Sequence, residues 1–287
     1  MARAKRPPPP TPKALEPLPP NTRAILRSGV EAVAYHIPIA PPSSTNPILK
    51  STIALPRRSR WTSGLHFHTT HTEYLRLIKG SIFVELDGVT KILSAKAGGE
   101  ISSKTSQLVK TGLEITVDKY ARHNWGRAEE YLAWRWIGIG SVTKIVPPED
   151  RDEEVIVEEW TDPVDIAKPL FFWNLNGVIT APLNAPLSAR QSLIRLALGA
   201  WWIPFQLYII FWDLDNWPIF FSLRLFSLGP SASSGNHLVA RFGRLVEYLV
   251  TFVVLFVAKA LGRLTGTQPV SRDRTPEELW QAYQKGR

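Results

Sequence analysis

Histidine is concentrated in one short stretch of this 287-residue chain. Three of its six histidines and one glutamate fall in HFHTTHTE, from His66 to Glu73. In a β-strand, side chains two residues apart point to the same face, so His66 and His68 are expected to project together. Glu73 lies five residues after His68, across a polar segment that could turn the chain and bring the carboxylate to the same centre. Further along, His123 in DKYARHNW is the strongest candidate for a fourth ligand, because it follows the alternating, strand-like segment LEITVD.

These residue types define which ion the site would take. The chain contains no cysteine, which excludes thiolate nucleophiles and sulfur-ligated metals. Three imidazoles and one carboxylate suit Fe(II), Mn(II), Ni(II), Cu(II) or Zn(II), and open coordination positions favour oxygen chemistry over structural zinc. We therefore predict one divalent transition metal, with Fe(II) as the expected ion, bound by His66, His68, Glu73 and His123. The alternative is that these histidines are polar residues on an exposed strand edge.

His71 belongs to the same cluster but lies three residues after His68, so its side chain is expected to point away from the metal. It would then face solvent or the mouth of a pocket. Because histidine titrates near neutral pH, His71 is the candidate catalytic residue, acting as a proton shuttle. The competing interpretation is an exposed histidine in a turn. Nothing near His36 or His237 suggests a role for either.

The elements that must position these residues are short β-strands. In SIFVELDGVTKIL the apolar residues alternate, and the DG dipeptide supplies a tight hairpin turn. The segments VEAVAYHI, STIAL, LEITVD, YLAWRWIGI and EEVIVEEW also read as strands, separated by turn-forming residues. In YLAWRWIGI the alternation places Leu132, Trp134 and Trp136 on one face. No helical period appears between residues 29 and 160, which predicts a mainly β antiparallel barrel or sandwich.

The stretch HFHTTHTEYLRLIKG resembles the first signature of the cupin superfamily, the RmlC-like barrels: His-x-His, four residues, Glu, six residues and Gly. The second signature, Pro-x-Gly-x-x-His-x-x-x-Asn, is kept at His123. Asp118, Tyr120 and Arg127 stand where proline, glycine and asparagine are usual. The resemblance covers roughly residues 60 to 130. It implies a double-stranded β-helix, or jelly-roll, barrel with the metal inside.

A narrower resemblance concerns VEEWTDPVDIAKPLFFWNLNGVI, which looks like an extension found in fungal cupin-domain proteins. Among these are oxidoreductases of polyketide gene clusters. The resemblance implies a metal-dependent oxidoreductase of secondary-metabolite biosynthesis that acts on a small hydrophobic metabolite of aromatic or polyketide type.

Two other hypotheses stay open. The same metal could act only as a Lewis acid, in isomerisation, cyclisation, dehydration or decarboxylation, with Glu73 or His71 moving protons. In the third hypothesis the barrel is a membrane-tethered module that binds a ligand without chemistry, since one fold hosts many functions.

Composition divides the chain into four parts. Residues 1–28 are basic and proline-rich and are expected to form a disordered leader. Residues 29–175 are assigned to the barrel with its extension, and residues 176–265 to a hydrophobic, mostly helical region. Residues 266–287 are expected to form a polar tail with a short helix.

The hydrophobic region contains two apolar blocks, LALGAWWIPFQLYIIFW and YLVTFVVLFVA, flanked by arginine and lysine. Each is shorter than the roughly 20 residues of a full membrane span. Basic flanks and several tryptophans suit a headgroup boundary, so we expect an intracellular protein associated with a membrane through these segments. A buried helical subdomain packed on the barrel is the alternative.

The formal net charge of +9 raises nucleic acid as a partner. The lysines and arginines are scattered, however, and no nucleic-acid-binding motif accompanies them. We therefore expect no nucleic-acid partner; anionic lipid or an acidic substrate explains the charge better. Because cupin barrels commonly pair, a homodimer also stays open.

Overall fold

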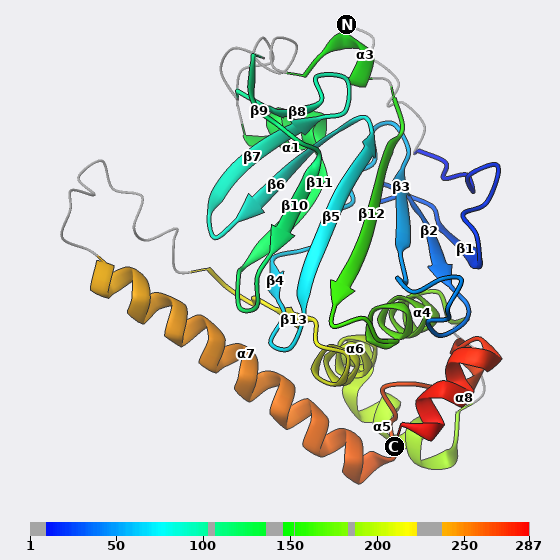
Figure 1. Cartoon of the computed structure of the whole chain (residues 1–287). Coiled ribbons are helices and arrows are strands. Elements are labelled where there is room, and N and C mark those ends of the chain that lie inside the picture. Colours follow the sequence, from blue (N-terminus) through cyan, green and yellow to red (C-terminus); the bar gives the residue numbers. More distant parts are fainter. Residues whose placement is uncertain are drawn as a thin grey trace, which may run out of the picture.

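The computed structural model describes residues 10–102, 107–135, 146–151, 153–182, 187–222 and 237–286. Two antiparallel sheets face each other and enclose the main hydrophobic core (Figure 1). The first has the strand order β1-β2-β3-β12-β5-β10, and the second has the order β13-β4-β11-β6-β7-β8-β9. This mainly β, jelly-roll arrangement with a helical C-terminal region confirms the predicted fold class.

The strands of the first sheet are β1 (Thr22–Arg27), β2 (Val33–Pro38), β3 (Ser51–Leu55), β12 (Val155–Asp162), β5 (Thr72–Lys79) and β10 (Glu114–Val117). The strands of the second sheet are β13 (Trp217–Pro218), β4 (His66–Phe67), β11 (His123–Arg127), β6 (Ser81–Leu86), β7 (Val89–Ser94), β8 (Gly99–Ile101) and β9 (Leu108–Thr111). The helices are α1 (Ala128–Arg135), α3 (Pro148–Arg151), α4 (Ala167–Ile179), α5 (Ala189–Leu198), the 3-10 helix η1 (Gly199–Trp201), α6 (Trp202–Asp213), α7 (His237–Thr265), the 3-10 helix η3 (Arg272–Arg274) and α8 (Glu277–Lys285).

Glycines at two turns let the strands meet. The β6–β7 hairpin closes through Asp87 (φ 47°) and Gly88 (φ 82°), the left-handed pair that a two-residue type I′ turn requires. Gly80, the glycine of the cupin-like signature, connects β5 to β6 at φ 78°. A Cβ there would lie 2.9 Å from Cγ2 of Val155, so the backbone position admits only glycine without rearrangement.

The segment YLAWRWIGI is not a strand where the structure describes it. Residues 128–135 form the helix α1, and Ala128 and Leu132, four residues apart, are both buried in a small cluster with Phe83 of β6. Tyr131 stacks on the same Phe83 ring at 4.1 Å between centroids. The helical spacing of these contacts, set by the neighbouring sheet, overrides the local alternation. Trp136 lies outside the described residues.

The predicted leader also differs from the structure. Strand β1 lies within residues 1–28 and pairs along its whole length with β2. Just before it, the backbone N–H of Leu15 donates to Nε2 of buried His36 at 2.9 Å. The ordered fold therefore begins well before residue 29. Residues 1–9 lie outside the described part.

The C-terminal helices pack on the barrel rather than forming a separate body. Helix α4 contributes Leu170, Phe171 and Phe172 to the main core, and α6 contributes Ile210. The two-residue strand β13, just after α6, adds to the second sheet beside β4. Helix α7 runs along the outside of this assembly (Figure 1). Four residues of the first apolar block, Trp202, Phe205, Ile209 and Ile210 of α6, are thus buried in the protein.

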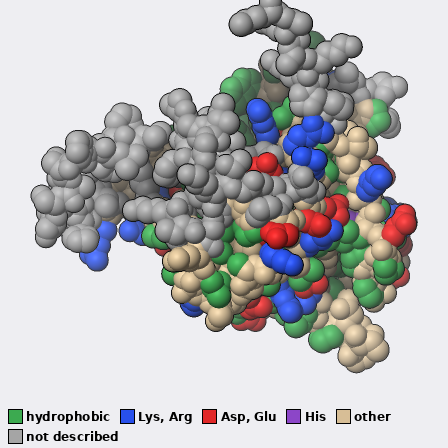
Figure 2. All heavy atoms as spheres, turned by 90° about the horizontal axis from the view of Figure 1, so that it is seen from above, with side chains coloured by type: hydrophobic (Ala, Val, Ile, Leu, Met, Phe, Trp, Pro, Cys, Tyr) green, Lys and Arg blue, Asp and Glu red, His purple; other side chains and the backbone are tan. Residues whose placement is uncertain are grey.

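The end of the barrel that points away from α7 and α5 carries a mixed surface. Seen from that side, acidic, basic and hydrophobic side chains are interspersed on the described residues (Figure 2). Such mixing is typical of a solvated protein surface.

Candidate metal centre

The four residues predicted as metal ligands come together inside the barrel. One ligand atom from each of His66, His68, Glu73 and His123 lies within 4.8 Å of the other three, and all four side chains are buried. The His66 and His123 rings are closest, with centroids 4.0 Å apart. These residues come from β4 and its end, from β5 and from β11, so that both sheets contribute.

The register of β4 explains why the histidines face inward. His66 pairs directly with His123 of the neighbouring antiparallel strand β11. His68 lies two residues further on and points to the same side, with its ring 5.1 Å from that of His66. Phe67, between them, points outward and packs on the Tyr248 ring of α7 at 4.6 Å. The two-residue alternation inferred from the sequence is therefore realised.

The segment before His123 turns through a backbone conformation that normally favours glycine. Tyr120, which stands where glycine is usual, has a left-handed backbone with φ 63°. This conformation costs a non-glycine residue about 1–2 kcal/mol, and it lets the chain turn so that the Tyr120 N–H donates to the carbonyl of His68 at 2.7 Å. Arg127, in the asparagine position, is buried and donates to the backbone carbonyls of Leu55 and Glu153.

The three rings are held so that their Nε2 atoms face one another. Nδ1 of His66 lies 2.8 Å from the carbonyl of Gly64, and Nδ1 of His123 lies 3.1 Å from that of Ala121. Nδ1 of His68 bonds to the backbone carbonyl of Asp215. A carbonyl can only accept, so each Nδ1 carries the proton and each Nε2 presents a lone pair. This is the tautomer that binds metal.

A cation fits this donor set. Nε2 of His123 is buried, lies 3.4 Å from Oε2 of Glu73 and makes no hydrogen bond. Burial and the neighbouring histidines hold the pKa of His66 well below its usual value, so its ring is neutral and free to coordinate. A buried nitrogen without a partner is costly, and a divalent ion among the four ligand atoms would remove that cost.

Glu73 is fixed by a buried lysine. Its Oε2 faces the histidines, while its Oε1 lies 2.8 Å from Nζ of Lys168. The same ammonium lies 3.1 Å from Glu159, which also accepts from Nε1 of Trp125 at 2.7 Å. Burial alone would raise the pKa of Glu73, but Lys168 and His68 outweigh it and hold the pKa well below its ordinary value. Glu73 is therefore an ionised ligand with one oxygen directed at the centre.

Asp215, from the C-terminal region, closes the loop that follows His68. Its carboxylate accepts hydrogen bonds from the backbone N–H groups of Thr69, Thr70 and His71 at 2.7, 3.0 and 3.1 Å. Together with its carbonyl bond to His68, it ties the metal loop to the segment after α6.

His71 has surroundings different from those predicted. It is buried, its Nδ1 lies 2.8 Å from Asp215 and its Nε2 lies 2.9 Å from Asp165. Hydrogen bonds to these two carboxylates raise the pKa of His71 to about 9. A ring held protonated between two aspartates is a poor proton shuttle, and His71 does not line the pocket described below. In the structure His71 connects the loop to Asp165 and Asp215, and its catalytic role stays a prediction.

A cavity of about 260 Å³ reaches the metal centre from the side of α4. It touches His66 among the four metal ligands and also contains Glu159 and Lys168. Its apolar walls are mainly aromatic: Tyr35, Trp61, Phe171, Phe172 and Phe211. Size and lining suit a small, largely apolar molecule with few polar groups.

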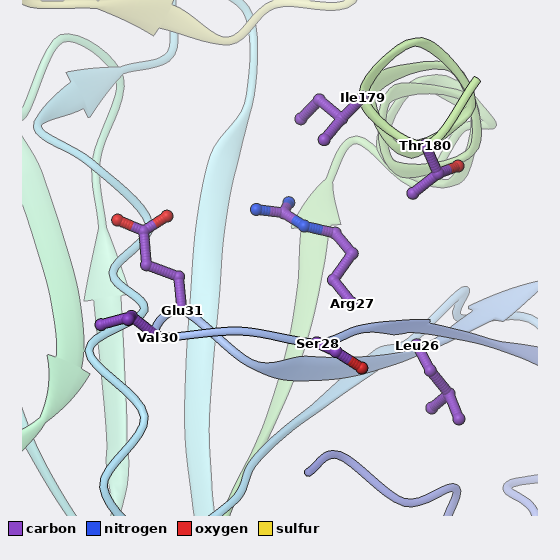
Figure 3. Close-up of a pocket in the computed structure, with 7 residues that line it drawn as sticks. All are labelled: Leu26, Arg27, Ser28, Val30, Glu31, Ile179 and Thr180. Atoms are coloured by element: carbon purple, nitrogen blue, oxygen red, sulfur yellow. The ribbon is translucent and has the colours of Figure 1, made fainter. Parts of the chain in front are cut away.

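The cavity opens beside the β1–β2 connection. Arg27 and Glu31 line both the cavity and a shallower surface pocket of about 510 Å³. In Figure 3 these two side chains extend on the side of the connection that faces Ile179 and Thr180 at the end of α4. The charged side chains of Arg27 and Glu31 therefore lie at the rim of the cavity, and the aromatic side chains lie deeper.

Inside the cavity Tyr35 is positioned to donate a hydrogen bond. Its hydroxyl accepts from Nε1 of Trp61 at 2.9 Å, which leaves its own proton available. Burial raises the pKa of Tyr35 to about 12, so the hydroxyl stays protonated at neutral pH.

Sequence reasoning missed Lys168, Glu159, Asp215 and the Tyr35–Trp61 pair. Glu159 carried a signal: it occupies the inward position of β12 in line with Val155 and Val157. Lys168 is a single cation beside the apolar run PLFFW. Asp215 carried none, because its partners lie about 145 residues away in sequence.

No protein-family model matches the chain, and no curated protein matches it in sequence. Solved structures do match in part. A cupin-2 domain from Rhodospirillum rubrum matches with 10% identity, over 50% of this chain and 70% of that one, at a TM-score of 0.29. KdgF from Halomonas sp. matches with 12% identity, over 45% of this chain and 79% of that one, at a TM-score of 0.26. A predicted oxalate decarboxylase from Thermotoga maritima matches with 13% identity, over 49% of this chain and 90% of that one, at a TM-score of 0.27.

The fold and the site together define a class. Two facing antiparallel sheets that enclose the His66, His68, Glu73 and His123 cluster form a jelly roll with four buried residues that could hold a metal ion. The solved structures to which it is similar include cupin domains.

Proposed function

We propose that this chain is a metal-dependent enzyme of the cupin kind that binds one divalent transition metal through His66, His68, Glu73 and His123. The observation that carries the proposal is the convergence of the four buried ligand atoms within 4.8 Å, beside a cavity that touches His66. When bound, the metal would supply Lewis acidity or redox chemistry to a substrate oxygen.

The chain's own residues would bind and orient the substrate. The aromatic walls favour a small hydrophobic, aromatic or polyketide-type metabolite and exclude water from it. The hydroxyl of Tyr35 would donate to a substrate oxygen, and Lys168 keeps Glu73 directed at the centre. We propose oxidation as the reaction, in secondary-metabolite biosynthesis, with Fe(II) as the ion; the donor set supports this choice of ion.

A non-redox reaction is the second candidate, and one observation favours it. Glu159 and Lys168 face the cavity together with the Tyr35 hydroxyl, so groups able to move protons lie beside the metal site. Isomerisation, cyclisation and dehydration need such groups and no oxidant.

Elemental analysis of the purified full-length chain tests both candidates. Bound Fe with oxygen uptake in the presence of small phenolic compounds supports oxidation, whereas Zn or Mn without uptake supports the non-redox reaction. His66→Ala and Glu73→Gln should each lose the metal with the barrel still folded. His36→Gln, at a buried histidine outside the cluster, is the matched control and should keep it. A chain that purifies without metal and takes up none would contradict the proposal. The hypothesis of a ligand-binding module without chemistry would then remain.

A further inference from the structure

Helix α7 has one face that is largely exposed in the described structure, although Phe252 and Phe256 on it also contact the Trp212 ring. Nine large apolar side chains on it are each between 45% and 67% exposed: Phe242, Leu245, Leu249, Phe252, Val253, Phe256, Val257, Leu261 and Leu264. Their spacing of three and four residues places them along one side of the helix. Arg241 directly precedes this stripe, and Arg263 lies next to its last residue, Leu264. An apolar strip of this length on a water-facing helix marks an interaction site.

The opposite face of α7 is fixed to the barrel by polar contacts. Glu247 is buried in an ion pair with Arg122, and Lys259 pairs with Asp213. The hydroxyl of Thr251 donates to the carbonyl of Pro218 at 2.8 Å. The helix therefore lies lengthwise against the protein, as Figure 1 shows, with the apolar stripe turned outward.

These contacts decide between the two ways in which α7 could meet a membrane. Two helical stretches, Ala189–Asp213 and Arg241–Thr265, are long and apolar enough to cross a bilayer, a test that core helices of soluble proteins also pass. A spanning α7 would have to leave the barrel, break the ion pairs of Glu247 and Lys259 and carry both charges toward the hydrocarbon, which is unfavourable for ionised side chains. A helix lying in the interface plane keeps every polar contact and buries only its outer face.

The charges around the stripe fit an anionic bilayer. Between residues 166 and 272 the sequence has three acidic residues, Asp213, Asp215 and Glu247. All three are bonded within the fold. The same stretch has nine lysines and arginines, of which Arg190, Arg241, Arg263 and Arg272 are exposed. Helices α5 and α7 are thus basic, with no exposed acid among their described residues, whereas Asp273, Glu277 and Glu278 just beyond this stretch are exposed. The opposite end of the barrel is mixed in charge (Figure 2).

A second group of exposed apolar residues extends the surface. Leu193 and Leu196 of α5 and Trp201 of η1 are 69%, 82% and 64% exposed. The other side of α5 packs through Ile194 and Leu198 on a cluster that includes Ala258 of α7. In Figure 1, α5 and α7 both lie below the barrel, at the end opposite α3, β8 and β9. Tryptophan favours the headgroup boundary.

We propose that α7 docks flat in the interface of an anionic phospholipid bilayer, with its stripe of apolar residues in the acyl boundary and α5 beside it. The barrel and its metal centre stay outside the hydrocarbon. This surface shares no residue with the metal centre or the cavity. The docking proposal can therefore be tested independently of the proposed reaction.

Flotation of the full-length chain with vesicles tests the docking. The chain should float with vesicles of phosphatidylcholine and phosphatidylserine, and less with phosphatidylcholine alone or in high salt. Leu245→Glu and Leu249→Glu, at two of the most exposed residues of the stripe, should each lower the partition coefficient by about tenfold or more. Val109→Glu, at a similarly exposed apolar residue on β9, is the matched control and should bind as the unaltered chain does. Equal flotation of all these variants would overturn the proposal.

Fluorophore labelling distinguishes flat docking from spanning and from self-association. Because the chain has no cysteine, Leu245→Cys, Val253→Cys and Leu261→Cys each give one labelled site on the stripe. Flat docking predicts that lipid-borne quenchers report the same shallow depth at all three. A site at 253 much deeper than the other two would indicate a span and refute the proposal. Burial of the labels in a dimer, with no vesicle binding, would refute it in favour of a second copy.

Discussion

Nζ of Lys168 lies 2.8 Å from Oε1 of Glu73, so a residue at the start of α4 sets the orientation of a metal ligand on β5. Both side chains are buried, and Glu159 shares the ammonium group from the other side. An ion pair that is excluded from water keeps its geometry far better than one on the surface.

Lys168→Met should weaken metal binding by about 10- to 100-fold, the usual effect of losing a partner that orients a ligand. Without the ammonium, burial raises the pKa of Glu73 and its Oε1 loses its partner. Competition with a chromophoric chelator measures the affinity. Lys50→Met is the matched control, because Lys50 also pairs with a glutamate, Glu158, at 2.9 Å but in a partly exposed setting. Similar affinities for the two variants would show that Lys168 does not orient the ligand.

Asp215→Asn should destabilise the protein by about 1–3 kcal/mol and weaken metal binding together. Asparagine tolerates the left-handed backbone found at this position, φ 51°, but it cannot accept all the bonds that the carboxylate receives from residues 69 to 71. Chemical denaturation with and without metal measures both effects. The matched control is Asp213→Asn, which loses a partly exposed ion pair with Lys259. Its free energy of unfolding should change by less than about 1 kcal/mol. If the two variants behave alike, the loop is not held by Asp215.

The pH dependence of stability should carry a contribution from His71. Its pKa in the folded protein, about 9, lies above the ordinary value of 6.5 because Asp165 and Asp215 face both ring nitrogens. A raised pKa in the folded state means that the contribution is fully present below about pH 6.5 and is lost as the pH rises through about 9. Unfolding curves of the chain and of His71→Gln should therefore converge across this window. NMR titration of the ring gives the pKa directly, and a value at or below 6.5 would contradict the structure.

The sequence predicted the parts of this molecule that local spacing encodes. His66, His68 and Glu73 follow the two-residue alternation and the short turn of the signature, and the β6–β7 hairpin follows from Asp87-Gly88. The helix α1 was missed because Leu132 and its neighbours alternate locally, whereas the packing of Ala128 and Leu132 on Phe83 selects a helix.

The parts that the sequence did not reveal depend on long-range contacts. Lys168 meets Glu73 across 95 residues, and Asp215 meets His68 across 147 residues. Strand β1 is an edge strand that pairs only with β2 in the described sheet, so its position depends on a partner that its own residues do not reveal. The sequence also predicted a barrel separate from the region of residues 176–265. The structure joins the two through long-range contacts, because β13 and Asp215 belong to that region and contact β4 and His68.

Arg122 and Glu247 should behave as a coupled pair that attaches α7 to the barrel. Glu247→Leu alone leaves the Arg122 guanidinium buried without its carboxylate, at an expected cost of about 3–5 kcal/mol. The double variant Arg122→Met with Glu247→Leu replaces the pair by apolar side chains of similar size and should recover most of that loss. Denaturant unfolding of both single variants and the double variant completes the cycle. Additive losses would show that the two residues act separately, and α7 would then be held to the barrel mainly by Thr251, Lys259 and its aromatic contacts.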